Sequence, residues 1–93
     1  SPVMVKEKIQ PSKSEDEKSS ELKDIILFND DVNTFDFVIE TLIDVCEHDP
    51  HQAEQCTLVV HFKGKCAVKS GYYSELELPH KEMSDRGLTV TIE

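Results

Sequence analysis

Apolar residues are spaced along the chain in a pattern that indicates first a strand and then a helix. Residues 24–28 (DIILF) form an apolar, β-branched run that ends in a polar turn, which is typical of a buried strand. From Thr34 to Cys46, apolar residues recur every three or four positions, and acidic residues occupy the opposite face. This spacing predicts an amphipathic helix with Thr34 as its N-cap.

A second helix is predicted to follow, and two further strands come later. Asp49 is a suitable N-cap, Pro50 suits the first helical position, and Gly64 provides the stop. After this glycine, residues 66–68 (CAV) are short but apolar and can form a second strand. Residues 88–92 (LTVTI) alternate apolar and polar side chains, which predicts a half-buried third strand.

The segment between these two strands, residues 70–87, carries weaker signals. Ser74 and Glu77 have the spacing of a capping box, which indicates the start of a helix. Pro79 follows soon after, and a proline disturbs a helix interior because it donates no backbone hydrogen bond. We therefore expect one or two helical turns and then irregular chain up to Gly87.

Together these elements predict an α+β domain with the order β-α-α-β-α-β. The sheet is expected to be small, three-stranded and antiparallel, with the helices packed on one face. We expect this domain to span residues 23–93. Residues 1–22 include the polar run SKSEDEKSS and two prolines, without a sustained apolar period, so we expect them to form a flexible N-terminal extension.

Length and charge limit the kinds of partner. Ninety-three residues suffice for one small domain. Nineteen acidic residues against ten Lys and Arg give a net charge of −9, which opposes binding to nucleic acid or to an anionic membrane. No apolar run is long enough to span a membrane, and the N-terminus lacks the pattern of a signal peptide. We therefore expect a cytoplasmic protein that binds neither nucleic acid nor a membrane.

The cysteines and histidines raise the possibility of a metal site. Three cysteines without a CxxC pair do not make a disulfide framework, so reduced and mostly packed thiols are the simplest interpretation. A zinc site is the alternative, although no pair has the short spacing that preforms a tetrahedral site. Its candidate ligands are Cys46, His48, His51, Cys56, His61 and Cys66.

Polar residues at the end of the first strand are the main candidates for a functional site. Asn29, Asp30 and Asp31 follow that strand directly, and His61 lies near the end of the second helix. Amide, carboxylate and imidazole groups can together accept the three hydrogen bonds of an ammonium ion. The simpler alternative is that the three residues only form a turn, and that His61 interacts with the carbonyls of its own helix.

An enzyme could use the same residues. Asp30 or Asp31 would then orient His61 as a general base, and a nearby Cys or Ser would act as nucleophile. The sequence supplies neither an oxyanion hole nor a recognisable nucleophile motif. We therefore predict that the protein is not an enzyme and uses no cofactor.

Three segments carry a resemblance to a known family. Residues 27–31 (LFNDD), 33–39 (NTFDFVI) and 60–65 (VHFKGK) resemble ClpS, the family of adaptors that bring N-degron substrates to bacterial Clp proteases. The resemblance implies an α+β unit with three helices on a three-stranded antiparallel sheet, in agreement with the elements predicted above. It also implies a monomer without catalytic activity.

The resemblance implies a function in protein degradation. A member of this family binds the free N-terminal residue of a substrate and delivers the substrate to the N-domain of the AAA+ unfoldase of the Clp protease, of the ClpA or ClpC type. The N-terminal extension would be engaged by the unfoldase. The alternative is a protein-interaction domain of the same fold, resembling the C-terminal domain of the ribosomal stalk protein, that has lost the N-degron pocket.

The resemblance also implies a role for individual residues. The α-ammonium and the first peptide group would be held by Asn29, Asp31 and His61, with Asp30 and Asn33 lining the mouth of the pocket. Phe35 stands where the family usually has a gating Met, and Thr57 replaces another Met, which implies a wider pocket. The residues implied to surround the substrate's first side chain are Phe35, Val38, Thr57, Val60, Leu27, Leu88 and Asn33.

Overall fold

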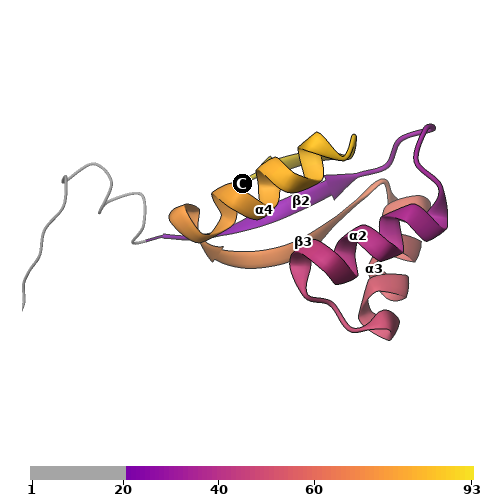
Figure 1. Ribbon diagram of the computed structural model, residues 1–93, viewed down its shortest axis with the longest axis horizontal. Coiled ribbons are helices and arrows are strands. Elements are labelled where there is room, and N and C mark those ends of the chain that lie inside the picture. The colour runs from indigo at the N-terminus through magenta and orange to yellow at the C-terminus, as the bar shows by residue number, and fades with distance from the viewer. Residues whose placement is uncertain (1–20) are drawn as a thin grey trace, which may run out of the picture.

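The computed structural model describes residues 21–93, so nearly all of the predicted flexible extension lies outside the described residues. It contains three strands and three helices in the predicted order, which confirms the predicted fold class. The elements are β2 (Leu22–Phe28), α2 (Phe35–Cys46), α3 (Pro50–Lys63), β3 (Lys65–Tyr72), α4 (Tyr73–Asp85) and β4 (Thr89–Ile92) (Figure 1).

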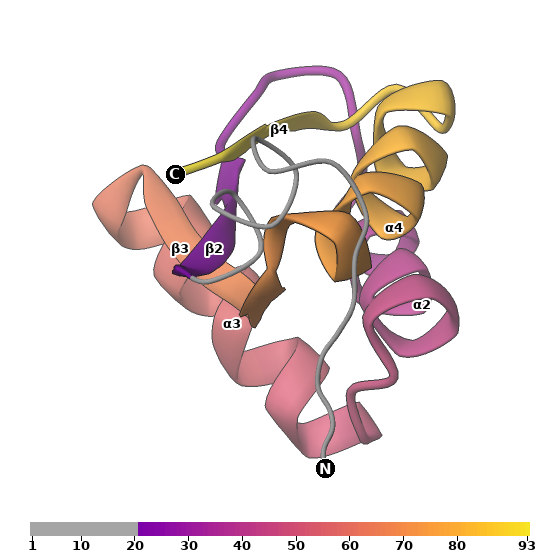
Figure 2. The ribbon, with the colours of Figure 1, turned by 90° about the vertical axis from the view of Figure 1, so that its left-hand side faces the viewer.

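The sheet is antiparallel and has β2 at its centre, in the order β3-β2-β4. Leu27 is paired with Cys66 on one side and with Val90 on the other. Leu27 and Ile25, two residues apart on the same face, are almost fully buried beneath the helices, as the two-residue period of a strand requires. Figure 2 shows α2 and α4 side by side over the sheet.

The predicted helix ends are confirmed by their capping bonds. The Thr34 hydroxyl accepts a hydrogen bond from the backbone N–H of the third residue of α2, at 3.1 Å. Asp49 does the same for α3 at 2.8 Å, and Pro50 occupies the first position of that helix. Gly64 ends α3 with a φ of 95°, a left-handed conformation that a residue without Cβ adopts at little cost.

The helix predicted within residues 70–87 is present, but its predicted length was wrong, because α4 is a continuous helix of 13 residues that contains Pro79. Its first turn is fixed by Glu75, whose carboxylate accepts the Tyr72 backbone N–H at 2.8 Å, so Tyr72 rather than Ser74 is the N-cap. An internal proline costs a helix roughly 3 kcal/mol. Leu76 and Met83 of α4 are fully buried, and burial contributes about 1.5–3 kcal/mol for each such side chain. The burial of these two side chains therefore offsets the free-energy cost of the proline.

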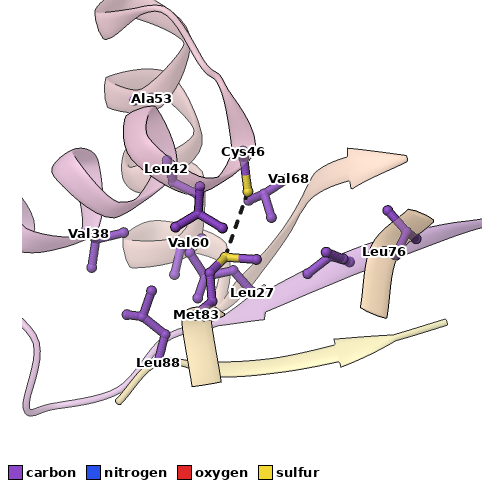
Figure 3. Packing of buried hydrophobic residues seen from close by; sticks show 12 residues of the cluster. Leu27, Val38, Leu42, Cys46, Ala53, Val60, Val68, Leu76, Met83 and Leu88 are labelled. Carbon is purple, nitrogen blue, oxygen red and sulfur yellow. Dashed lines mark hydrogen bonds between the residues drawn. The ribbon is translucent and has the colours of Figure 1, made fainter. Parts of the chain in front are cut away.

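The hydrophobic core lies between the sheet and the three helices (Figure 3). Leu42 of α2 and Met83 of α4 are both fully buried within it. The thiol of Cys46 lies 3.7 Å from the Met83 sulfur, which joins the end of α2 to α4. Figure 3 shows Val38 and Leu88 at one end of this core, where the candidate site is found.

Histidine side chains bind a backbone carbonyl on each edge strand. His48 Nε2 lies 2.6 Å from the Val68 oxygen of β3, and His80 Nε2 lies 3.0 Å from the Val90 oxygen of β4. A carbonyl only accepts, so Nε2 carries the proton in both rings. His48 is buried, whereas His80 is half-buried. The loop between α2 and α3 is thereby fastened to β3.

Replacing His48 with Ala is expected to destabilise the fold by about 2–4 kcal/mol. The change leaves a cavity and removes the only side-chain donor that the described residues offer to the Val68 oxygen. Urea denaturation monitored by circular dichroism measures the free energy of unfolding. His80→Ala is the matched control, with a smaller expected loss because His80 is half-buried. Equal losses in the two variants would contradict the structural role of His48.

Two thiols make the fold sensitive to alkaline pH. Burial raises the pKa of Cys46 to about 11. Burial, together with the neighbouring Cys66, raises the pKa of Cys56 to about 11. In the unfolded chain a thiol titrates near pH 8.5, so the unfolded state releases its proton first and rising pH favours unfolding. The contribution of these two thiols to the free energy of unfolding is therefore fully present below about pH 8.5 and is lost as the pH rises toward about 11.

Thermal unfolding monitored between about pH 8 and 11 tests this prediction. The melting temperature of the wild type should fall more steeply than that of the double variant Cys46→Ala and Cys56→Ala. The comparison with this variant removes the contribution of lysines and tyrosines, which titrate in the same range. Parallel curves for the two proteins would show that these thiols are not the cause.

Candidate functional site

A cavity of about 240 Å³ opens where the end of β2 meets α2 and α3. A smaller hollow of about 20 Å³ adjoins it and shares five of its lining residues. The larger cavity is lined by Asn29, Asp30, Asp31, Asn33, Phe35, Val38, Thr57, Val60 and His61. The smaller one is lined by Leu27, Phe28, Asn29, Asp30, Asn33, Val38, Val60 and Leu88. Every residue to which the ClpS resemblance assigns a role in the pocket thus lines at least one of the two.

Three parts of the chain that are distant in sequence bring these side chains together: residues 27–38, residues 57–61 and Leu88. The loop after β2 supplies the polar residues, α2 and α3 supply most of the apolar wall, and Leu88 comes from the turn before β4. On α3, Thr57, Val60 and His61 are spaced three and four residues apart and therefore lie on one face. The Asn29 backbone N–H donates to the Gly64 carbonyl at 2.9 Å, which joins the end of β2 to the end of α3.

Asp30 organises the loop that carries the polar residues. One carboxylate oxygen accepts the backbone N–H groups of Val32 and Asn33, both at 2.8 Å. The other accepts the Asn33 side-chain amide at 2.8 Å. The Asn33 backbone bond is the main cause that lowers the pKa of Asp30, and it outweighs the opposing effect of burial. Asp30 is therefore ionised near neutral pH, with both oxygens engaged inside the loop.

Asp31 and His61 leave their polar groups available at the mouth of the cavity. Both are exposed. Within residues 21–93, the Asp31 carboxylate makes no hydrogen bond or ion pair, and His61 makes only an edge-on ring contact with Phe62, with centroids 5.0 Å apart. A carboxylate and an imidazole that line the same cavity without polar partners can each accept a hydrogen bond from a cationic group.

The inner wall of the cavity is apolar. Val38, Thr57 and Val60 are at most 9% exposed, whereas Phe35, at the start of α2, is 38% exposed and stands near the opening. The Thr57 hydroxyl donates to the Ala53 carbonyl one turn earlier in α3, at 2.7 Å. Its proton is thus committed within the helix, so Thr57 offers no hydrogen-bond donor to a ligand.

Two residues beside the cavity were not identified from the sequence. Phe28 lines the smaller hollow, and its place directly before Asn29 in the LFNDD segment was a usable signal. Gly87 was predicted only as the end of an irregular segment. Its carbonyl accepts a hydrogen bond from the Asn33 side chain at 3.0 Å, a contact that spans 54 residues of sequence and that no local pattern indicates.

The structure does not support the zinc alternative. Among residues 21–93, no three His, Cys, Asp or Glu side chains lie close enough together to hold a metal ion. Cys46 contacts Met83, His48 binds a backbone carbonyl, and the thiols of Cys56 and Cys66 interact with each other. In the same part of the chain, no helix combines the length and the apolar character needed to cross a bilayer.

The fold and the cavity define a small α+β domain with a pocket that has an apolar interior and a polar, acidic mouth. The family described as ATP-dependent Clp protease adaptor protein ClpS matches residues 18–91. The chain therefore belongs to the ClpS family, which confirms the resemblance found in the sequence.

Individual relatives agree with this assignment. The chain is 37% identical over 75 residues to the Clp protease adapter protein ClpS of Acetivibrio thermocellus, covering 76% of each chain. It is 44% identical over 56 residues to ClpS of Campylobacter jejuni, a match that covers 58% of this chain and 55% of that relative. The matched region thus spans about half the length of the Campylobacter relatives.

A solved structure has the same fold. This is the structure of Agrobacterium tumefaciens ClpS2 bound to L-phenylalaninamide. The ClpS2 chain is 26% identical to this chain, and the two structures superpose with a TM-score of 0.74. The match covers 77% of this chain and 94% of the ClpS2 chain.

Proposed function

We propose that this protein is a non-catalytic adaptor that binds destabilising N-terminal residues of substrate proteins and delivers them to the AAA+ unfoldase of a Clp protease. Membership of the ClpS family supports this function. The observation that carries the proposal is the cavity itself, because an apolar chamber with an acidic mouth matches an amino-terminal residue. When that residue is apolar, it carries its side chain and its cationic α-amino group on the same carbon.

The mouth of the cavity would select the free α-ammonium. An α-amino group has a pKa of roughly 7.7–8.0, so it is mostly cationic near neutral pH. Asn29, Asp31 and His61 line the opening and can accept its hydrogen bonds, with the Asp31 charge strengthening them. An internal residue or an acetylated terminus offers no such cation. Asp30 would act mainly by shaping the loop, since both its oxygens are already engaged.

The chamber would select the first side chain by size and polarity. Val38, Thr57 and Val60 form a wall without free hydrogen-bond donors, which favours Phe, Leu, Tyr or Trp over charged residues. The ligand of the Agrobacterium protein supports this choice, because L-phenylalaninamide has a free amino group and a benzyl side chain. Thr57 is short, which leaves room for β-branched first residues such as Ile.

Delivery to the unfoldase is tested by a degradation assay. A reporter protein that begins with Phe, a Clp protease and its ClpA-type or ClpC-type unfoldase are incubated with and without this chain. The proposal predicts faster degradation of the reporter when the chain is present, and no acceleration for the same reporter beginning with Met. Equal rates with and without the chain would favour the alternative, an interaction domain of this fold that delivers no N-degron.

A further inference from the structure

Asn33 uses both hydrogens of its side-chain amide to join the site loop to a distant turn. One hydrogen is donated to Asp30, with the nitrogen 2.8 Å from the carboxylate oxygen. The other is donated to the Gly87 carbonyl, 3.0 Å away, in the turn between α4 and β4. An amide nitrogen has two hydrogens for donation, so its capacity is fully used here.

The Gly87 end of this bridge is a fixed anchor. Gly87 has a φ of 91°, and its N–H donates to the Ser84 carbonyl at 2.9 Å. The next N–H, of Leu88, donates to the Met83 carbonyl at 3.1 Å, and Met83 itself is fully buried. These two bonds close the C-terminal end of α4 and hold the Gly87 carbonyl in place.

The bridge spans the cavity wall. Asn33 and Leu88 both line the smaller hollow, and Leu88 follows Gly87 directly in the chain. The other end of the same loop is joined to α3 by the bond between Asn29 and the Gly64 carbonyl. The loop that carries Asp31 is thus held at both ends, once to α3 and once to the turn after α4.

We propose that Asn33 is a positioning residue, which prepares the site for the amino terminus of a substrate by fastening the loop that carries Asn29 and Asp31 to the α4–β4 turn. Asn33 itself donates nothing to the ligand, because its amide hydrogens are already used. The inference rests on the proposed function, since it concerns the same site. A loop that is already ordered before binding loses less conformational entropy when the ligand arrives.

Asn33→Ala should weaken the binding of a fluorescent peptide with a free N-terminal Phe by about tenfold, because two hydrogen bonds that order the loop are lost. Fluorescence anisotropy gives the affinity, and thermal unfolding of the same samples reports stability. Arg86→Ala is the matched control, because it removes the exposed Arg86–Asp44 ion pair (3.4 Å) at the same end of α4, outside the cavity. It should leave the affinity unchanged.

A second variant separates positioning from loss of structure. Asn33→Asp replaces the two hydrogen-bond donors with a carboxylate that faces the Asp30 carboxylate. Near neutral pH, this variant should bind the peptide even more weakly than Asn33→Ala does. As the pH falls, one acid of the pair gains a proton and with it a donor. The ratio of the wild type's affinity for the peptide to that of Asn33→Asp should therefore become smaller at lower pH. Asp31 and His61 also line the cavity but are present in both proteins, so their titration cancels in this ratio.

The outcomes distinguish this inference from the proposed function. Equal affinities of wild type and Asn33→Ala would overturn the positioning role alone, and so would a ratio for Asn33→Asp that does not depend on pH. A wild type that fails to bind the peptide would overturn the proposed function and this inference together.

Discussion

Asp31→Asn is expected to lower the affinity for a peptide with a free N-terminal Phe roughly tenfold to hundredfold. The substitution keeps the shape of the side chain and removes its charge. Asp31 lines the mouth of the cavity, and its carboxylate has no protein partner among residues 21–93. A hydrogen bond to a charged group contributes about 1.5–3 kcal/mol, which corresponds to this loss in affinity. Isothermal titration calorimetry measures the affinity directly.

Asp36→Asn provides the matched control for this charge effect. Asp36 is an exposed acid in the first turn of α2 and lies outside the cavity lining. Removing its charge changes the net charge of the protein by the same amount. It should weaken binding only slightly, because exposed charges at a distance are screened by salt. Similar losses for the two variants would mean that the overall negative charge, and not a contact with Asp31, attracts the peptide.

Thr57→Phe is expected to abolish most binding of peptides that begin with Phe or Leu. The new ring would occupy the chamber that the first side chain needs. Burial of a large apolar side chain contributes about 1.5–3 kcal/mol, so excluding it should cost about tenfold to hundredfold in affinity. Fluorescence anisotropy with the same peptides measures the loss, and circular dichroism checks that the variant is folded.

Val59→Phe places the same ring on the same helix without filling the chamber. Val59 is 37% exposed and lies outside the cavity lining. This variant should therefore bind as the wild type does. Normal binding by Thr57→Phe would show that the first side chain enters somewhere else, whereas weak binding by both variants would indicate a general effect on α3.

Much of the fold could be predicted because its signals are local. The N-caps Thr34 and Asp49, the proline at the start of α3 and the glycine at its end each act within one helical turn. The alternating residues 89–92 indicate a strand by the same kind of short-range pattern. These predictions needed no knowledge of the tertiary structure.

The helix α4 could not be predicted because tertiary packing stabilises it. Pro79 is unfavourable within a helix, and the sequence does not show that Leu76 and Met83 become fully buried against the sheet and α2. The N-cap was also predicted two residues too late, because the Glu75 carboxylate accepts the backbone N–H of Tyr72 and not that of a Ser. Local preference and packing disagree in this segment, and packing prevails.

The sequence predicted which residues gather around the candidate site, but it did not predict how the loop between β2 and α2 is held. Asn29, Asp30, Asp31 and His61 were expected to lie together, and all four line the larger cavity. The sequence did not show that Asp30 is engaged by its own loop or that Asn33 reaches Gly87. Those bonds depend on a long-range contact and on the exact course of a turn.

The most direct measurement of the central claim compares two peptides that differ only at the amino terminus. Wild-type protein is titrated into a fluorescent peptide that begins with Phe, with its α-amine either free or acetylated, and anisotropy is recorded. Our account predicts binding of the free terminus, and at least tenfold weaker binding after acetylation, because the charge recognised by Asp31 is gone. Equal affinity for both peptides, or binding of neither, would contradict it.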